Sequence, residues 1–382
     1  MEVMRKHYKI ITIFIFVFTT IVLTCEYSQA HDKFVKLNFT DEDGGKPVAL
    51  SENEIFLPGG SYNKKTKSFN TAKIYNIKDH TLIDTSTTMN TPRYSYEAIK
   101  YDNNYILIVG GFCSDNNKNP YSCSQTAEIY NIKENKFIKI SNTNLKYKNN
   151  IHAISLDKEK VFILSGSHFE IFNPVNNEFS IIANRRQYNS TRHEYMYTIN
   201  NYASSDILQI NQNEILIYGT RPLTTVPDRE LFAMEIFNLE TKKSINIPVD
   251  YSKLSYINIG SPIKIDNETI LFVGAGIDKK DVVKFNLKTK SFENYNRLPL
   301  PLSSDGFLLN NSKVLFVRGS LFTPDYFRGT SLERAIYDCK TNKIYNYKTS
   351  HKSHYTPKII NLDNNSVYIS GYKTDEPLLY KY

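Results

Sequence analysis

The chain repeats one pattern seven times. In each copy a short apolar strand ends at a step of small residues. The strands with their steps are IFLPGG (55–60), YILIVGG (105–111), VFILSG (161–166), EILIYGT (214–220), ILFVGAG (270–276), VLFVRG (314–319) and VYISG (367–371). A repeat of about 50 residues is typical of units that bury their apolar faces only against neighbouring units. The repeat therefore constrains the fold more than any local motif does.

A second pattern follows six of these steps. An aromatic residue is followed by Asn or Asp and, a few residues later, by an aromatic or apolar residue in five of the six segments, with Ser244 at that place in the sixth. These segments are AKIYNIKDHTL, AEIYNIKENKF, FEIFNPVNNEF, MEIFNLETKKS, VVKFNLKTKSF and RAIYDCKTNKI. In the unit at 96–140, two further strands and tight turns complete the pattern. Each unit is therefore predicted to form one four-stranded antiparallel sheet.

The two patterns together resemble the kelch-repeat β-propellers of the bacterial exported type. The Gly pair is intact at 59–60 and 110–111, whereas the family's Trp is replaced by residues such as Phe137, Phe179 and Phe292. The resemblance covers almost all of residues 31–382. It implies one all-β domain over that range, a seven-bladed kelch-type β-propeller.

The two ends of the repeat region favour a closed ring. The seventh unit stops after its third strand, LLYKY (378–382), and an unassigned strand, FVKLNF (34–39), precedes the first unit. We therefore expect the N-terminal strand to close the last blade as its outer strand, which removes an open sheet edge. A ring of six blades with a degenerate segment is the alternative.

Residues 1–30 are predicted to be a secretory signal peptide. Basic residues precede the apolar run 10–25, and Ser28-Gln29-Ala30 supplies a small-residue cleavage site. An uncleaved anchor is the alternative, although the run is shorter than the roughly 20 apolar residues that a spanning helix needs. We expect export to the periplasm or the outside of the cell, with no stable membrane span after cleavage.

The cysteines and the charge fit an exported protein. Cys113 and Cys123 bracket the loop FCSDNNKNPYSC, and in an oxidising compartment this spacing predicts a disulfide. The formal charge of +8 comes largely from Lys residues scattered through turns. Such scattered Lys residues indicate a solvated surface and not a nucleic-acid groove. We expect no nucleic-acid partner and a monomeric protein.

Loop lengths differ between the two expected faces of the ring. The turns between first and second strands, and between third and fourth strands, are tight throughout, as in DNN and KEN. The connections between second and third strands and between blades share the other face and vary widely in length. Variable loops on a rigid ring are where recognition usually resides. This surface, the long-loop face, is the predicted binding face.

Arg and aromatic residues gather in these long connections. Such residues suit carboxylates, sugars and the centres of protein interfaces. The candidate binding residues are Arg93, Tyr94, Tyr96, Arg192, His193, Tyr195, Arg221, Asp228, Asp325, Tyr326 and Arg328.

Catalytic motifs are not evident. His351 and His354 form a poor metal pair because no third ligand is in view. We expect neither a metal nor another cofactor and assign no catalytic residue. The favoured hypothesis is a binding module for a protein or a glycan. The alternative is a carbohydrate-active enzyme such as a sialic-acid mutarotase-like epimerase, because exported kelch propellers include such enzymes.

Overall fold

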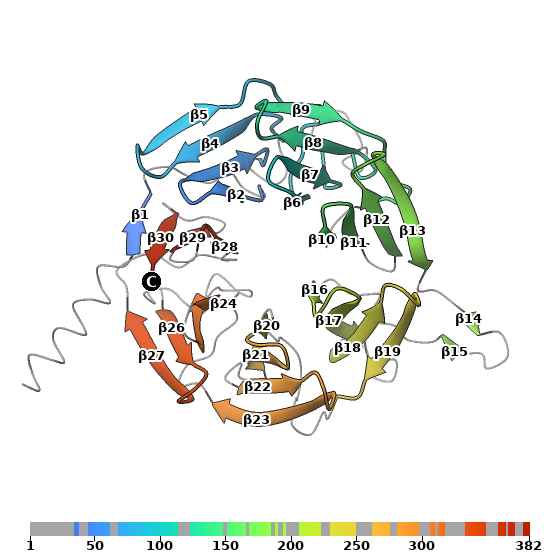
Figure 1. Ribbon diagram of the computed structural model, residues 1–382, viewed down its shortest axis with the longest axis vertical. Helices are drawn as coiled ribbons and strands as arrows, with labels where there is room; N and C mark the ends of the chain where they lie inside the picture. Colours follow the sequence, from blue (N-terminus) through green and yellow to red (C-terminus); the bar gives the residue numbers. More distant parts are fainter. Residues whose placement is uncertain are drawn as a thin grey trace, which may run out of the picture.

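The structure is a computed structural model. It describes residues 34–37, 45–61, 68–113, 123–147, 151–165, 168–184, 188–189, 194–195, 206–222, 230–249, 262–275, 281–297, 306–309, 312–317, 333–348, 358–363, 366–370 and 377–382. Seven four-stranded antiparallel sheets are arranged as the blades of a ring (Figure 1). The chain is therefore a seven-bladed β-propeller, as predicted, and the six-bladed alternative is excluded.

The first strand of each blade faces the centre of the ring (Figure 1). Blade 1 contains β2 (Val48–Ser51), β3 (Glu54–Pro58), β4 (Ala72–Asn76) and β5 (Thr81–Asp84). Blade 2 contains β6 (Glu97–Lys100), β7 (Tyr105–Val109), β8 (Ala127–Asn131) and β9 (Lys136–Lys139). Blade 3 contains β10 (Ile151–Asp157), β11 (Lys160–Ser165), β12 (His168–Asn173) and β13 (Glu178–Asn184).

The remaining blades continue the same order. Blade 4 contains β16 (Asp206–Gln209), β17 (Glu214–Pro222), β18 (Glu230–Asn238) and β19 (Lys243–Ile247). Blade 5 contains β20 (Ile263–Lys264), β21 (Thr269–Ala275), β22 (Asp281–Asn286) and β23 (Ser291–Arg297). Blade 6 contains β24 (Gly306–Leu309), β25 (Lys313–Val317), β26 (Glu333–Asp338) and β27 (Lys343–Lys348). A separate pair, β14 (Tyr188–Asn189) and β15 (Glu194–Tyr195), lies between blades 3 and 4 in the sequence.

Blade 7 joins the two ends of the described chain. Its strands are β28 (Lys358–Asn361), β29 (Ser366–Ser370), β30 (Leu378–Lys381) and β1 (Phe34–Lys36). The outer strand β1 pairs antiparallel with β30, in a register that places Phe34 opposite Tyr380. This pairing confirms the predicted closure by the N-terminal strand. The predicted leader at 1–30 lies outside the described residues.

The aromatic–Asn element builds the tight turn between the third and fourth strands. In blade 1, the Asn76 side-chain oxygen accepts hydrogen bonds from the N–H groups of Lys78 and Asp79 at 2.9 and 3.1 Å. The same contacts recur at Asn238, Asn286 and Asp338. An Asx side chain stabilises a turn in this way by replacing a backbone acceptor. The repeated residue pair therefore has a structural cause.

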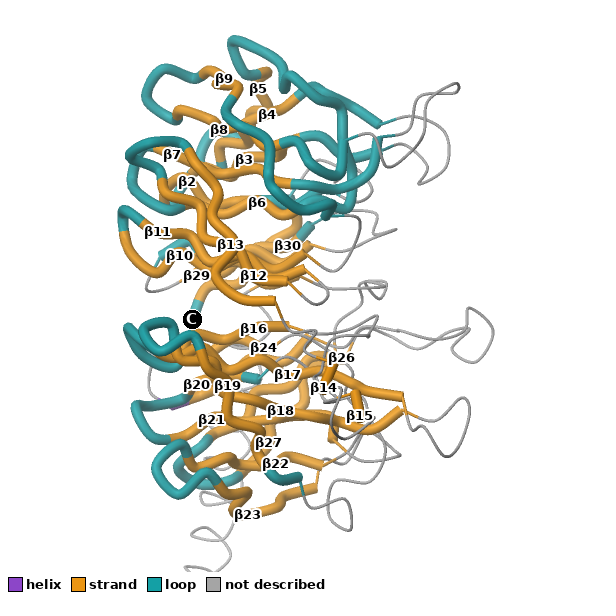
Figure 2. Tube along the Cα trace, turned by 90° about the vertical axis from the view of Figure 1, so that its right-hand side faces the viewer, coloured by secondary structure: helices purple, strands orange, loops and turns teal. Residues whose placement is uncertain are grey.

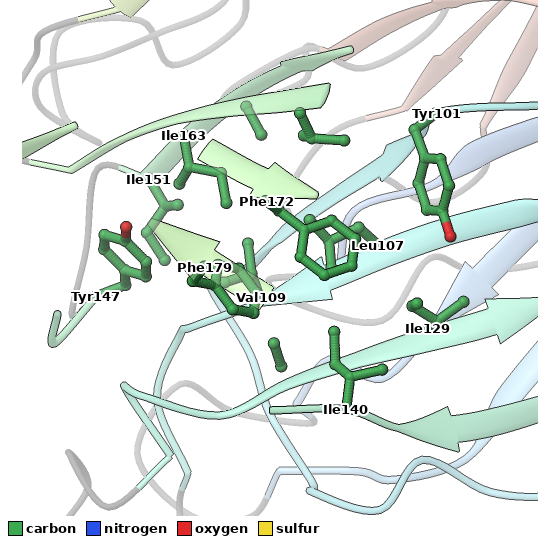
Figure 3. Close-up of a cluster of buried hydrophobic side chains, with 13 residues drawn as sticks. Tyr101, Leu107, Val109, Ile129, Ile140, Tyr147, Ile151, Ile163, Phe172 and Phe179 are labelled. Atoms are coloured by element: carbon green, nitrogen blue, oxygen red, sulfur yellow. The ribbon is translucent and has the colours of Figure 1, made fainter. Parts of the chain in front are cut away.

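Apolar side chains from adjacent blades form the core. Between blades 2 and 3, Leu107, Val109, Ile163 and Phe172 are fully buried in one cluster (Figure 3). Burying a side chain of this size stabilises the fold by about 1.5–3 kcal/mol. Because each sheet contributes to a cluster on either side, no blade completes its core alone.

The Gly pairs lie where a blade meets the segment that leads to the next blade. A Cβ on Gly111, whose φ is +93°, would lie 2.7 Å from the Tyr94 carbonyl oxygen and 2.8 Å from Tyr96 Cβ. The Gly111 N–H donates to the Tyr147 carbonyl at 3.1 Å. In blades 1 and 2, the connection between second and third strands therefore touches the inter-blade segments.

Tight turns of several blades lie along the left side of Figure 2. Within the described residues no helix is long and apolar enough to cross a membrane.

Candidate functional site

Arg93 lies in the segment between blades 1 and 2, and its side chain is fully buried. Its guanidinium donates to the carbonyl oxygens of Gly110 and Thr126 at 2.8 and 3.1 Å and forms a 2.9 Å ion pair with Glu128. Burial lowers the pKa of Arg93 and Glu128 opposes that shift. Arg93 therefore links the inter-blade segment to blade 2. Its predicted binding role stays a prediction that these contacts do not favour.

The two tyrosines near Arg93 also make contacts within the ring. Tyr96 is buried; its hydroxyl donates to the Pro58 carbonyl and accepts the Lys46 N–H at 3.2 Å. Tyr94 is half-buried and pairs through its backbone with Phe112, with ring centroids 5.6 Å apart. Tyr94 is thus the more accessible of the two predicted contacts.

The other predicted positions are described only in part. Tyr195 belongs to β15, and Arg221 lies on β17 opposite Leu231. Arg192, His193, Asp228, Asp325, Tyr326 and Arg328 lie outside the described residues. Binding roles at all these positions stay predictions. The predicted disulfide is confirmed, because Cys113 and Cys123 are bonded with their Cα atoms 5.8 Å apart.

Charged residues that the sequence analysis missed gather at the start of the inner strands. Glu97, His152 and Asp206 each begin or nearly begin an inner strand and pair with Val109, Leu164 and Tyr218 of the next strand. In blade 1 the equivalent position is occupied by Lys46. Val48 pairs with Phe56 as Ile99 pairs with Leu107 in blade 2, and Lys46 precedes Val48 by two residues as Glu97 precedes Ile99. We call Lys46, Glu97, His152 and Asp206 the axial quartet. In blade 7, β28 places Lys358 at the same register position, opposite Ser370.

The axial quartet consists of two ion pairs, and each pair bridges two blades. Lys46 Nζ contacts Glu97 Oε1 between blades 1 and 2, and His152 Nδ1 lies 2.8 Å from Asp206 Oδ1 between blades 3 and 4. The exposed fractions of the side chains are 31% for Lys46, 6% for Glu97, 27% for His152 and 37% for Asp206. Three of the four side chains thus remain accessible to a ligand.

The second pair favours its charged forms. Burial is the largest single influence and lowers the pKa of His152. The charge and hydrogen bond of Asp206 and the charge of Glu97 together raise it, Lys46 opposes them, and the pKa lies above 6.5. Burial raises the pKa of Asp206, but His152, the Ile207 N–H and the Tyr218 hydroxyl lower it to below 3.8. Because the charges of Glu97 and Lys46 act on His152, the two pairs lie within electrostatic range of each other.

The inner strands begin at the inter-blade segments, so the axial quartet lies on the long-loop face. A signal for it was present in the sequence, in the triplets KPV (46–48), EAI (97–99), HAI (152–154) and DIL (206–208). Alignment of the inner strands by their pairing would have placed these four residues and Lys358 in one column. The described residues contain no group of three or more His, Cys, Asp or Glu side chains placed to hold a metal ion.

Comparison with known proteins shows likeness in fold. No protein-family model matches the sequence, and no curated protein matches it. A fungal alcohol oxidase of the AA5 family, solved in complex with copper, superposes with a TM-score of 0.62 at 12% identity, covering 91% of this chain and 75% of the oxidase. The extracellular domain of a one-component system from B. thetaiotaomicron superposes with a TM-score of 0.58 at 10% identity, covering 92% of this chain and 40% of that one. At such identities the likeness shows only that the chain shares the β-propeller fold.

Proposed function

We propose that this protein is an exported kelch-type propeller that acts as a binding module, with its ligand held on the long-loop face at the axial quartet. One observation carries the proposal: consecutive inner strands place charged side chains at a single register position, and three of the four stay accessible. Polar groups that converge on a rigid scaffold are what orient ligands in binding sites. The paired cysteines and the extracellular structural neighbour are consistent with export.

The proposal can be tested with defined ligand panels. The full chain is presented to a glycan array and to a synthetic peptide array, beside the double variant His152→Gln/Asp206→Asn. The matched control is Glu159→Gln, an exposed position in the tight turn after β10 on the opposite face. A ligand captured by the wild type and the control should bind the double variant about tenfold or more weakly. Equal binding by all three proteins would overturn the assignment of the site.

A carbohydrate-active enzyme is the second candidate, and the His152–Asp206 pair is the observation that favours it. Asp206 bonds Nδ1 of His152, and among the described residues Nε2 has no hydrogen-bond partner. A carboxylate that orients an imidazole is a common arrangement for moving protons. A sugar anomerisation assay checks this candidate. Acceleration by the wild type that His152→Gln abolishes would support it, and no acceleration would exclude anomerisation.

A further inference from the structure

We infer that the axial quartet takes a neutral, hydroxyl-rich ligand, that is, an uncharged saccharide unit. The inference rests on the proposed binding function and specifies the ligand of the same site. It follows from two properties of the four side chains: their balanced charge and the hydrogen-bonding positions that their mutual contacts leave unused.

The charges of the axial quartet cancel in alternating order over blades 1 to 4; Lys358, at the same register position in blade 7, lies outside the quartet. Lys46 faces Glu97, and at pH 6.5 or below, where the raised pKa of His152 keeps it protonated, His152 faces Asp206. Each charge then has an opposite partner. An anionic ligand group near Lys46 meets the Glu97 carboxylate beside it. A cationic group near Asp206 competes with His152. Either ligand must weaken an existing ion pair, and leaving one charge without its partner is strongly unfavourable where water is partly excluded. A neutral ligand has no such cost.

The unused hydrogen-bonding positions include both donors and acceptors. The Lys46 ammonium has three N–H groups, of which Glu97 accepts one. His152 Nε2–H is a second donor beyond its contact with Asp206. A carboxylate offers about four acceptor positions, and Asp206 uses three of them for His152, the Ile207 N–H at 2.7 Å and the Tyr218 hydroxyl. One acceptor position therefore remains on Asp206.

A hydroxyl group both donates and accepts, so it matches this arrangement better than a carboxylate or an ammonium does. At the second pair, one hydroxyl can accept from His152 Nε2 and another can donate to Asp206. At the first pair, Lys46 of blade 1 supplies further donors, two blades away from His152. The two pairs lie on four consecutive blades, so a molecule with several hydroxyls can contact both of them.

The test is calorimetric titration of the full chain with oligosaccharides of equal length and different charge. The neutral probes are maltohexaose, cellohexaose and the hexamer of N-acetylglucosamine; the charged probes are the hexamers of galacturonate and of glucosamine. We expect one neutral probe to bind and both charged probes to bind about tenfold more weakly or not at all. His152→Gln and Asp206→Asn should each reduce affinity about tenfold, because each removes one hydrogen bond to the ligand.

Two controls separate loss of binding from loss of fold. Both substitutions nearly conserve side-chain volume, and the melting temperature of each variant is measured beside the wild type. Glu159→Gln should bind like the wild type. Binding of no neutral probe, or tighter binding of a charged one, would overturn the inference. A peptide that binds through His152 and Asp206 would also overturn it, while leaving the proposed binding function in place.

Discussion

The junctions on the two sides of blade 2 use one geometry with different chemistry. In both, a buried Glu on the third strand holds the segment that leads into its own blade. Glu128 accepts the Asn90 N–H at 2.7 Å and pairs with Arg93. One blade later, Glu170 accepts the Asn144 N–H at 3.0 Å and the Tyr147 hydroxyl. Both junctions thus keep the contact between a backbone N–H and the buried Glu. They differ in the side chain three residues after that N–H, which is Arg93 in one and Tyr147 in the other.

The difference shows where each junction is vulnerable. The Arg93–Glu128 contact is a fully buried ion pair, so removal of the cation leaves a buried carboxylate without its countercharge. At the second junction, burial and the Glu170 carboxylate both raise the pKa of Tyr147, so its hydroxyl stays a neutral donor. Removal of the Tyr147 hydroxyl costs one hydrogen bond, but Glu170 loses no cationic partner. We therefore expect the two junctions to respond unequally to matched substitutions.

The largest effect should come from Arg93→Met. The variant keeps much of the side-chain volume but removes the guanidinium, and we expect the free energy of unfolding to fall by about 4 kcal/mol. Urea unfolding followed by circular dichroism measures this change. A loss no greater than that of Tyr147→Phe would contradict the distinction between the junctions. A stable Arg93→Met variant that fails only in ligand binding would restore the contact role predicted from the sequence.

Next in size should be removal of the disulfide, because it ties the two junctions together. Cys113 follows Phe112, which pairs with Tyr94 of the first junction, and Cys123 precedes Ser124, whose carbonyl accepts the Tyr147 N–H. Replacing both cysteines with Ser should reduce the free energy of unfolding by about 3 kcal/mol. The same loss should follow reduction of the wild type. If Arg93→Met loses the same free energy of unfolding with and without the two Cys→Ser substitutions, the junctions are independent.

Tyr147→Phe should have a smaller effect. It removes the hydroxyl that donates to Glu170 while the Asn144 N–H contact and the ring packing remain. We expect a loss of about 2 kcal/mol, the usual cost of a hydrogen bond to a charged group. Urea unfolding beside Arg93→Met supplies the measurement. Unfolding of Tyr147→Phe during expression would show that this junction also depends on a single contact.

The smallest effect should be a pH dependence from the His152–Asp206 pair, which joins blades 3 and 4. The raised pKa of His152 stabilises the fold below its ordinary pKa of 6.5, and this contribution is lost as pH rises through the raised value. The lowered pKa of Asp206 stabilises the fold above 3.8, and that contribution is lost as pH falls through the lowered value. Stability should therefore be greatest between these limits. Unfolding at several pH values should show a smaller alkaline decline in His152→Gln than in the wild type.

The sequence was sufficient for the ring and its closure because both depend on periodicity. Seven apolar strands and an unassigned strand at 34–39 permitted the observed closure with β30. The buried role of Arg93 could not be predicted because its partner Glu128 lies on another segment, 35 residues away. The axial quartet was missed because four different residue types occupy one register position. Comparing the repeats by residue identity does not detect a position that is charged in each of these four blades but differs in residue type and in sign.

The pairing of β1 with β30 also has a consequence for how the chain folds. The hydrogen bonds that close the ring join Phe34 to Tyr380, so they connect opposite ends of the described chain. Contacts between residues so distant in sequence form slowly, whereas each blade is built from local antiparallel pairings. The blades can therefore assemble one after another, and the ring becomes continuous only when the last strand meets the first. Closure is then the late step that converts a row of sheets into a structure without open ends.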